Sequence, residues 1–155
     1  MCQSKDNIPI MSDVEKTEQK TAPPEEVNDK YVLIADDQPD ISLALQIIFQ
    51  SRGYTVKVVD NGKKAWESVQ ASKPILVVSD ILMPLMNGLK LCENIKSDSK
   101  FADVPVILLT AVYRQQHHID MAFGHGADAY FSKPFNAERV LEVAEKLIRE
   151  AHPEK

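Results

Sequence analysis

Three aspartates are the residues of this chain best placed to do chemistry. Asp36 and Asp37 follow the apolar run 31–35, and Asp80 follows the apolar run 75–79. An apolar run without polar alternation is typical of a strand that is buried on both faces of a parallel sheet. Such sheets bind ligands outside the carboxyl ends of their strands, so Asp80 is the candidate reacting group. From this segment alone, Asp80 could equally be an aspartate that favours the turn after a strand.

Two more polar side chains end apolar runs later in the chain. Thr110 follows the run 104–109, and Lys133 closely follows the short run 127–131. In one parallel sheet, these side chains would share a crevice with the three aspartates. Crowded carboxylates repel one another and need protons, a lysine or a metal to compensate them. Oxygen ligands with room for waters favour Mg²⁺, and a hydroxyl with an ammonium suits a phosphoryl group.

The elements that must hold these residues alternate regularly from Tyr31 onward. Apolar runs predict strands at residues 31–35, 54–59, 75–80, 104–109 and 127–131. Helical spacing predicts helices that begin near Pro39, at 63–72, 88–97, 114–123 and 137–150. In the first helix, the buried face is expected to comprise Ile41, Ala44, Leu45 and Ile48.

This alternation predicts one doubly wound α/β domain, because parallel connections need crossovers and crossovers are right-handed. The runs 31–35 and 75–79 are the most continuous and are expected to be central neighbours. The run 54–59 contains Lys57 and is expected at the sheet edge. The prediction is a five-stranded parallel sheet in the flavodoxin-like order 2-1-3-4-5, with helices on both faces.

Composition limits the other possibilities. Residues 1–30 are polar and acidic and are expected to form a disordered tail or linker before a domain at 31–151. A net charge of -5 without clustered Lys and Arg argues against direct nucleic-acid binding. No apolar run approaches the length of a membrane span, so membrane insertion is not expected. Cys2 and Cys92 lack metal or disulfide spacing, which favours the cytoplasm.

Together these motifs resemble the receiver domain of two-component response regulators. The matching elements are Asp36-Asp37, Asp80 in Ser-Asp-Ile-Leu-Met-Pro-Leu-Met-Asn-Gly, Thr110-Ala111 and Lys133-Pro134-Phe135. They match in order and cover about residues 31–151. The resemblance implies that Asp80 accepts a phosphoryl group from a histidine of a kinase or phosphotransfer protein. It implies a signalling domain in a phosphorelay, with at most slow self-dephosphorylation, rather than an enzyme.

The resemblance also implies a metal site. Asp36, Asp37, the Asp80 carboxylate and the backbone carbonyl of Leu82 would bind Mg²⁺ or Mn²⁺. Leu82 and Val112 are apolar at positions where this family often carries polar groups that assist the attacking water. We therefore expect slow self-hydrolysis and a long-lived phosphorylated state.

The resemblance implies a second set of residues, which would bind the phosphoryl group and change conformation when it is present. Lys133 would pair with the phosphoryl group, and the peptide bond between Lys133 and Pro134 would be cis. Thr110, with Ala111 beside it, would contact the phosphoryl oxygens. Tyr130 resembles the family's switch aromatic, which turns inward when the threonine moves; the alternative is a half-buried strand aromatic without a switching role.

The expected partners are a histidine kinase or histidine phosphotransfer protein and a downstream protein bound through the face at 114–151. The domain would be a monomer or a phosphorylation-dependent dimer. No output domain is expected after Pro153, so output would run through protein contact, phosphorelay or a domain outside this sequence. The alternatives are a receiver-fold scaffold that is not phosphorylated and a receiver fragment of a hybrid kinase. A haloacid-dehalogenase-type phosphatase is disfavoured because Leu82 replaces its second carboxylate, and nucleotide enzymes because their glycine-rich loops are absent.

Overall fold

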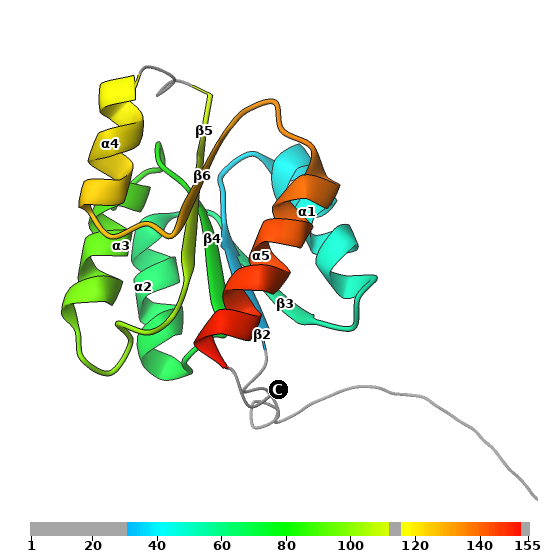
Figure 1. Cartoon of the computed structure of the whole chain (residues 1–155), viewed down its shortest axis with the longest axis horizontal. Coiled ribbons are helices and arrows are strands. Elements are labelled where there is room, and N and C mark those ends of the chain that lie inside the picture. Colours follow the sequence, from blue (N-terminus) through cyan, green and yellow to red (C-terminus); the bar gives the residue numbers. More distant parts are fainter. Residues whose placement is uncertain (1–30, 112–115, 153–155) are drawn as a thin grey trace, which may run out of the picture.

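The sheet carries the predicted topology. The computed structural model describes residues 31–111 and 116–152, and the predicted tail at 1–30 lies outside them. Five parallel strands form one sheet in the order β3-β2-β4-β5-β6 (Figure 1). Their bounds are β2 Tyr31–Ala35, β3 Thr55–Val59, β4 Leu76–Asp80, β5 Val106–Thr110 and β6 Ala129–Ser132. In chain order this is 2-1-3-4-5, so the predicted fold class and the central pairing of β2 with β4 are confirmed.

Helices cover both faces of the sheet, with α1 and α5 on one side and α2, α3 and α4 on the other (Figure 1). Their bounds are α1 Pro39–Gln50, α2 Gly62–Ala71, α3 Gly88–Ser97, α4 Gln116–Gly124 and α5 Ala137–Ala151. Three of them begin at an asparagine whose side chain accepts from backbone N–H groups of the first turn, as at Asn61, Asn87 and Asn136. Within the described residues, no helix is long and apolar enough to cross a membrane.

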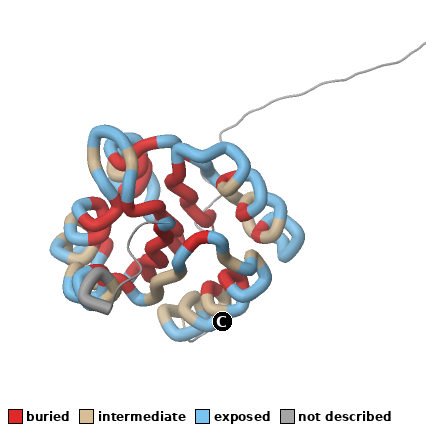
Figure 2. The backbone as a smooth tube through the Cα atoms, turned by 90° about the horizontal axis from the view of Figure 1, so that it is seen from above, coloured by how far each residue is buried: buried red, intermediate tan, exposed pale blue. Residues whose placement is uncertain are grey.

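Each central strand contributes side chains to two hydrophobic cores, one on each face of the sheet, because successive side chains of a strand point to opposite faces. In β2, Leu33 packs toward α2 and α3, while Val32 and Ile34 pack toward α1 and α5. All three are fully buried. Figure 2 shows the buried backbone gathered in the centre of the domain and the exposed backbone around it. This double burial explains why the strand sequences are apolar without alternation.

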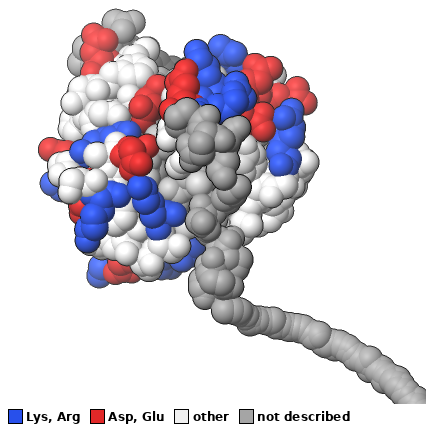
Figure 3. Space-filling model, turned by 60° about the horizontal axis from the view of Figure 1, so that its bottom comes forward, with Lys and Arg blue, Asp and Glu red and all other residues white. Residues whose placement is uncertain are grey.

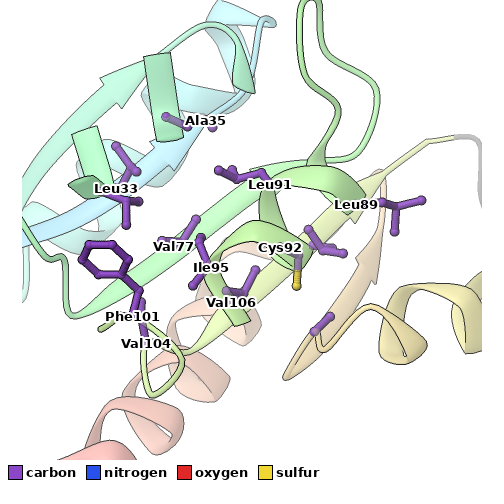
Figure 4. Packing of buried hydrophobic residues seen from close by; sticks show 14 of the residues in the cluster. Leu33, Ala35, Val77, Leu89, Leu91, Cys92, Ile95, Phe101, Val104 and Val106 are labelled. Carbon is purple, nitrogen blue, oxygen red and sulfur yellow. The ribbon is translucent and has the colours of Figure 1, made fainter. Parts of the chain in front are cut away.

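The core beneath α2 and α3 is continuous from the strands to the loop before β5. Figure 4 shows Leu33, Val77 and Ile95 pointing toward one another across this layer, with Phe101 at its end. Trp66 of α2 meets Phe101 edge to face, with ring centroids 5.9 Å apart. Aromatic pairs of this kind contribute about 0.5–1.5 kcal/mol beyond their buried area. The layer fixes α3, and with it the loop that follows Asp80.

The buried face of α1 differs from the predicted one. Ala44 is exposed, which corrects the prediction, and Leu43 and Ile47 are also exposed although both are apolar. Apolar residues surround most of this helix, so their spacing alone does not select the face that packs. The contacts with the sheet and α5 select it instead, through the side chains of Ile41, Leu45, Ile48 and Phe49.

The amino ends of the strands, opposite the candidate site, are joined by ion pairs. Lys96 of α3 lies 2.8 Å from Asp128, whose carboxylate also accepts from the N–H of Val106 at 2.9 Å. Lys73 and Asp103 pair at 2.9 Å but are largely exposed, and such pairs contribute about 0–1 kcal/mol. On the face drawn in Figure 3, acidic and basic side chains are interspersed among neutral ones.

Candidate functional site

Parallel strands bring the predicted polar residues to one edge of the sheet. Asp36 follows β2, Asp80 and Thr110 end β4 and β5, and Lys133 follows β6. The register aligns these ends, because Asp80 pairs with Leu109 next to Thr110 in the ladder. The backbone N–H of Lys133 donates to the carbonyl of Thr110 at 2.8 Å, which extends the alignment past β6. Asp36, Asp80, Thr110 and Lys133 are each buried, with exposures of 2%, 5%, 1% and 7%.

Three carboxylates form the acidic part of the site. Asp36, Asp37 and Asp80 each offer an oxygen, and these oxygens all lie within 4.8 Å of one another. Asp36 and Asp80 are buried, whereas Asp37 is exposed. An open cleft of about 380 Å³ lies beside Asp36 and Asp37, between the ends of β2 and β3. Asp36 and Asp37 line this cleft, and hard oxygen donors beside open space fit a small divalent cation that keeps part of its water shell.

Lys133 supplies the positive charge that opposes this acidic cluster. Its Nζ lies 3.0 Å from Oδ2 of Asp36 and 3.5 Å from Oδ2 of Asp80. It also donates to Oε1 of Gln38 at 2.6 Å. The peptide bond between Lys133 and Pro134 is cis. One buried ammonium thus faces two buried carboxylates, an arrangement in which each charge depends on the others.

Within the acidic cluster, Asp80 has a clearly shifted pKa. Burial and the neighbouring Asp36 carboxylate raise the pKa of the Asp80 carboxyl, Lys133 opposes them, and the net result is a pKa of about 6. A carboxyl group with such a pKa is a candidate for a functional role, because active sites concentrate such shifts. At neutral pH Asp80 is still mostly ionised and therefore able to act as a nucleophile.

The loop after Asp80 is held by close backbone packing. The N–H of Ile81 donates to the carbonyl of Leu109, and the N–H of Gly88 donates to the carbonyl of Ile81, both at 2.8 Å. Gly88 packs so tightly that a Cβ there would collide with the carbonyl oxygen of Asp80. Glycine at this position therefore fixes the distance between the start of α3 and the end of β4. Within the same loop, Leu85 has a positive φ of 71°.

Replacing Gly88 with alanine is expected to lower the free energy of unfolding by about 1–3 kcal/mol, because the added methyl group must displace the Asp80 backbone. Urea denaturation in Mg²⁺ measures this loss. Gly124→Ala is the matched control, since a Cβ at Gly124 meets nothing within 4 Å. Equal stability of the two variants would contradict the close packing at Gly88.

The remaining predicted residues lie around this centre. Tyr130 of β6 is half-buried and packs against the core beneath α2 and α3, so its switching role stays a prediction. Ala111 is exposed beside the buried Thr110. Leu82 is 44% exposed in the loop after Asp80. Val112 lies outside the described residues, so its predicted role stays a prediction.

Sequence reasoning missed two residues of the site. Gln38 is not among the predicted site residues, and nothing in a sequence indicates that its side chain reaches Lys133 across the sheet edge. Gly88 was identified only as a helix start. A signal existed there, because glycine directly after an Asn N-cap is a weak helix former and can indicate close packing.

Comparisons with known proteins agree with the geometry. The family model described as "Response regulator receiver domain" matches residues 32–145. The "DNA-binding dual master transcriptional regulator RpaA" of Synechocystis sp. is 35% identical over 118 residues, which cover 76% of this chain and 48% of that protein. The "DNA-binding response regulator MtrA" of Mycolicibacterium smegmatis is 34% identical over 121 residues, covering 76% and 50%. This chain thus spans about half the length of these relatives.

A solved structure shows the same architecture. The signal receiver domain of a signal transduction histidine kinase from Syntrophus aciditrophicus has a TM-score of 0.73 to this structure and 30% sequence identity. The match covers 79% of this chain and 92% of that one. The family match spans the sheet and most of its helices and includes all the buried polar residues of the site. The chain therefore belongs to the response regulator receiver domain family.

Proposed function

We propose that this domain accepts a phosphoryl group on Asp80 from a phosphohistidine and signals the change to a protein partner. The observation that carries the proposal is the convergence of Asp80, Lys133 and Thr110 at one sheet edge, where all three are buried. Burial of this polar set is unfavourable for folding alone. Its presence is therefore best explained by a reaction that uses it, and membership of a signalling family supports this explanation.

The proposed reaction is a phosphoryl transfer. An oxygen of the Asp80 carboxylate attacks phosphorus, the bond between phosphorus and the histidine nitrogen breaks, and the imidazole leaves with the bonding electrons. The product is an aspartyl phosphate. Lys133 would pair with the phosphoryl oxygens, since its Nζ already lies 3.5 Å from Asp80 Oδ2. Thr110, with Ala111 beside it, would contact the same oxygens after transfer.

The acidic cluster would hold Mg²⁺ or Mn²⁺ through Asp36, Asp37 and Asp80, with the carbonyl of Leu82 as a further ligand. The donor set supports this assignment, because the three carboxylate oxygens lie within 4.8 Å of one another and hard cations prefer oxygen. A bound cation would offset the repulsion among the carboxylates and the charge on the transferred oxygens.

Output would run through α4, β6 and α5, the described part of the face predicted at 114–151. Thr110 would move toward the phosphoryl group, and Tyr130 would then turn inward. Phe123 and Met121 of α4 are exposed by 46% and 38% and would contribute apolar surface to a protein contact. The expected lack of direct nucleic-acid binding, the monomeric or phosphorylation-dependent dimeric state and the cytoplasmic location stay predictions. The DNA binding in the names of RpaA and MtrA belongs to proteins of about twice the matched length.

The test is phosphorylation of the isolated domain. Incubation with acetyl phosphate and Mg²⁺, and separately with a phosphorylated histidine phosphotransfer protein, is followed by intact mass measurement. We expect one added phosphoryl group that requires Mg²⁺ and is absent from Asp80→Ala. No added mass with either donor would favour the alternative of a scaffold that is not phosphorylated.

The exposed Leu82 leads to a prediction about the lifetime of the phosphorylated state. We expect Leu82→Asn to lose its phosphoryl group at least about tenfold faster than wild type, because a polar group near the attacking water contributes strongly to such steps. Mass spectrometry at intervals after donor removal measures the rate. Leu85→Asn is the matched control, since Leu85 lies in the same loop and is 77% exposed. Loss from Leu82→Asn at or below the wild-type rate would contradict the prediction.

A further inference from the structure

Gln38 makes two contacts in the site, and only one of them involves its side chain. Its backbone N–H donates to Oδ1 of Asp36 at 2.8 Å. Its side-chain Oε1 accepts from Nζ of Lys133 at 2.6 Å, across a sequence separation of 95 residues. The side-chain contact is shorter than the distances from Nζ to Asp36 and to Asp80. A substitution of the side chain can therefore remove the lysine contact and leave the backbone contact in place.

The side chain of Gln38 does not cap the helix α1, which begins after it. Gln38 is the N-cap residue of α1, and it makes no side-chain hydrogen bond to the first turn. Ser, Thr, Asp and Asn are the residues that stabilise this position. Gln38 therefore stabilises α1 less than one of these four residues would at the same position. The contact with Lys133 is what the glutamine provides instead.

The geometry around Lys133 shows what this contact does. Asp36 and Gln38 both lie within hydrogen-bonding distance of Nζ, at 3.0 and 2.6 Å. Asp80 lies farther away at 3.5 Å, beyond the roughly 2.7–2.9 Å of a strong charge-assisted hydrogen bond. Asp36 and Gln38 therefore anchor the ammonium, and of these three contacts the one with Asp80 is the longest. A phosphoryl oxygen on Asp80 would enter from the side of Asp80.

We propose that Gln38 is a positioning residue that orients the Lys133 ammonium toward the phosphoryl group on Asp80. This inference rests on the proposed function of Asp80. A glutamine oxygen is a neutral acceptor, so it holds the ammonium without adding charge to the acidic cluster. It thereby fixes the direction of the lysine without competing electrostatically with the phosphoryl group. The lysine is then in place before the reaction, and no reorganisation is needed during transfer.

Gln38→Ser separates this role from a structural one. Serine supplies the missing cap of α1 but is too short to reach Lys133. We expect the melting temperature to rise by about 3 °C. We also expect phosphorylation by acetyl phosphate in Mg²⁺ to slow about tenfold, since misplaced catalytic groups lose rate steeply. A purely structural role predicts that stability and rate change in the same direction. A rate equal to wild type would overturn the proposal.

A double substitution tests whether the effect passes through Lys133. In a Lys133→Met background with Mg²⁺ present, Gln38→Ser is expected to change the phosphorylation rate by less than about twofold, because the group that Gln38 positions is gone. A tenfold loss in that background would overturn the proposal.

A third measurement does not depend on phosphorylation. Nitrogen-15 NMR of the lysine ammonium groups is expected to show a slowly exchanging Lys133 signal in wild type that broadens in Gln38→Ser. An unchanged signal would overturn the positioning role. A changed signal in a domain that no donor phosphorylates would instead contradict the proposed function of Asp80.

Discussion

Lys133→Met is expected to lower the free energy of unfolding of the metal-free domain by about 3–5 kcal/mol at pH 7.5, the usual loss when one partner of a buried ion pair is removed. The variant leaves Asp36 and Asp80 buried near each other without the ammonium that lies 3.0 and 3.5 Å from them. Methionine keeps much of the volume of the lysine stem, so lost charge rather than lost packing dominates the effect. Guanidinium denaturation in the presence of EDTA measures it.

Lys73→Met is the control for this loss. Lys73 also pairs with an aspartate at 2.9 Å, but its side chain is 45% exposed, so we expect a change of about 0–1 kcal/mol. Mg²⁺ is expected to restore part of the stability of Lys133→Met, because a cation bound to the carboxylates replaces the missing positive charge. Similar losses in the two variants would show that burial does not strengthen the Lys133 pairs.

Asp80→Asn is expected to have the opposite effect and to raise the free energy of unfolding of the metal-free domain by up to about 3 kcal/mol at pH 7.5. The pKa of Asp80 is about 6 in the folded protein, above the 3.8 that is usual for an aspartate carboxyl group in an unfolded chain. The folded state therefore binds the Asp80 proton more tightly than the unfolded chain. Above pH 6 the Asp80 carboxyl is ionised in both the folded and the unfolded protein, so the cost of burying its charge lowers the stability by its full amount. Asparagine removes that charge.

The stability difference between Asp80→Asn and wild type is expected to depend on pH. As the pH falls from 6 toward 3.8, folded wild type takes up the Asp80 proton before the unfolded chain does. The destabilisation by Asp80 is lost over that range, so the difference between Asp80→Asn and wild type should shrink toward pH 4. Denaturation curves of both proteins in EDTA from pH 4 to 8 measure the difference. A difference that grows as the pH falls would contradict the raised pKa.

Mg²⁺ is expected to make wild type more stable than Asp80→Asn, the reverse of their order without metal. Wild type gains stability by binding the ion, whereas Asp80→Asn has lost one charged ligand and should gain less. Lys133→Met and Asp80→Asn thus test the same balance between the acidic cluster and the positive charges that compensate it. The domain keeps an acidic cluster that weakens the metal-free fold, Lys133 compensates part of it, and a cation would compensate more. Such a balance is expected of the proposed function, in which the site would admit both a metal and a phosphoryl group.

Much of this protein was determined by local sequence. Apolar runs and helical spacing predicted every strand and helix of the described residues within a few positions, because burial on both faces of a parallel sheet imposes apolar strands. The same argument placed Asp36, Asp80, Thr110 and Lys133 at one sheet edge, because parallel strands present their carboxyl ends together. Neither conclusion needs a side-chain distance.

Only the tertiary structure decided how these residues meet. The face of α1 that packs, with Ala44 outside it, was set by neighbouring elements, because apolar residues surround that helix. The fit of Gly88 against the Asp80 carbonyl depends on the path of the loop between them, and the contact of Gln38 with Lys133 joins segments that are 95 residues apart. Periodicity indicates which side of an element is buried only where apolar and polar residues lie on different sides. It carries no information on the register, loop path and side-chain conformation that bring two particular atoms within hydrogen-bonding distance.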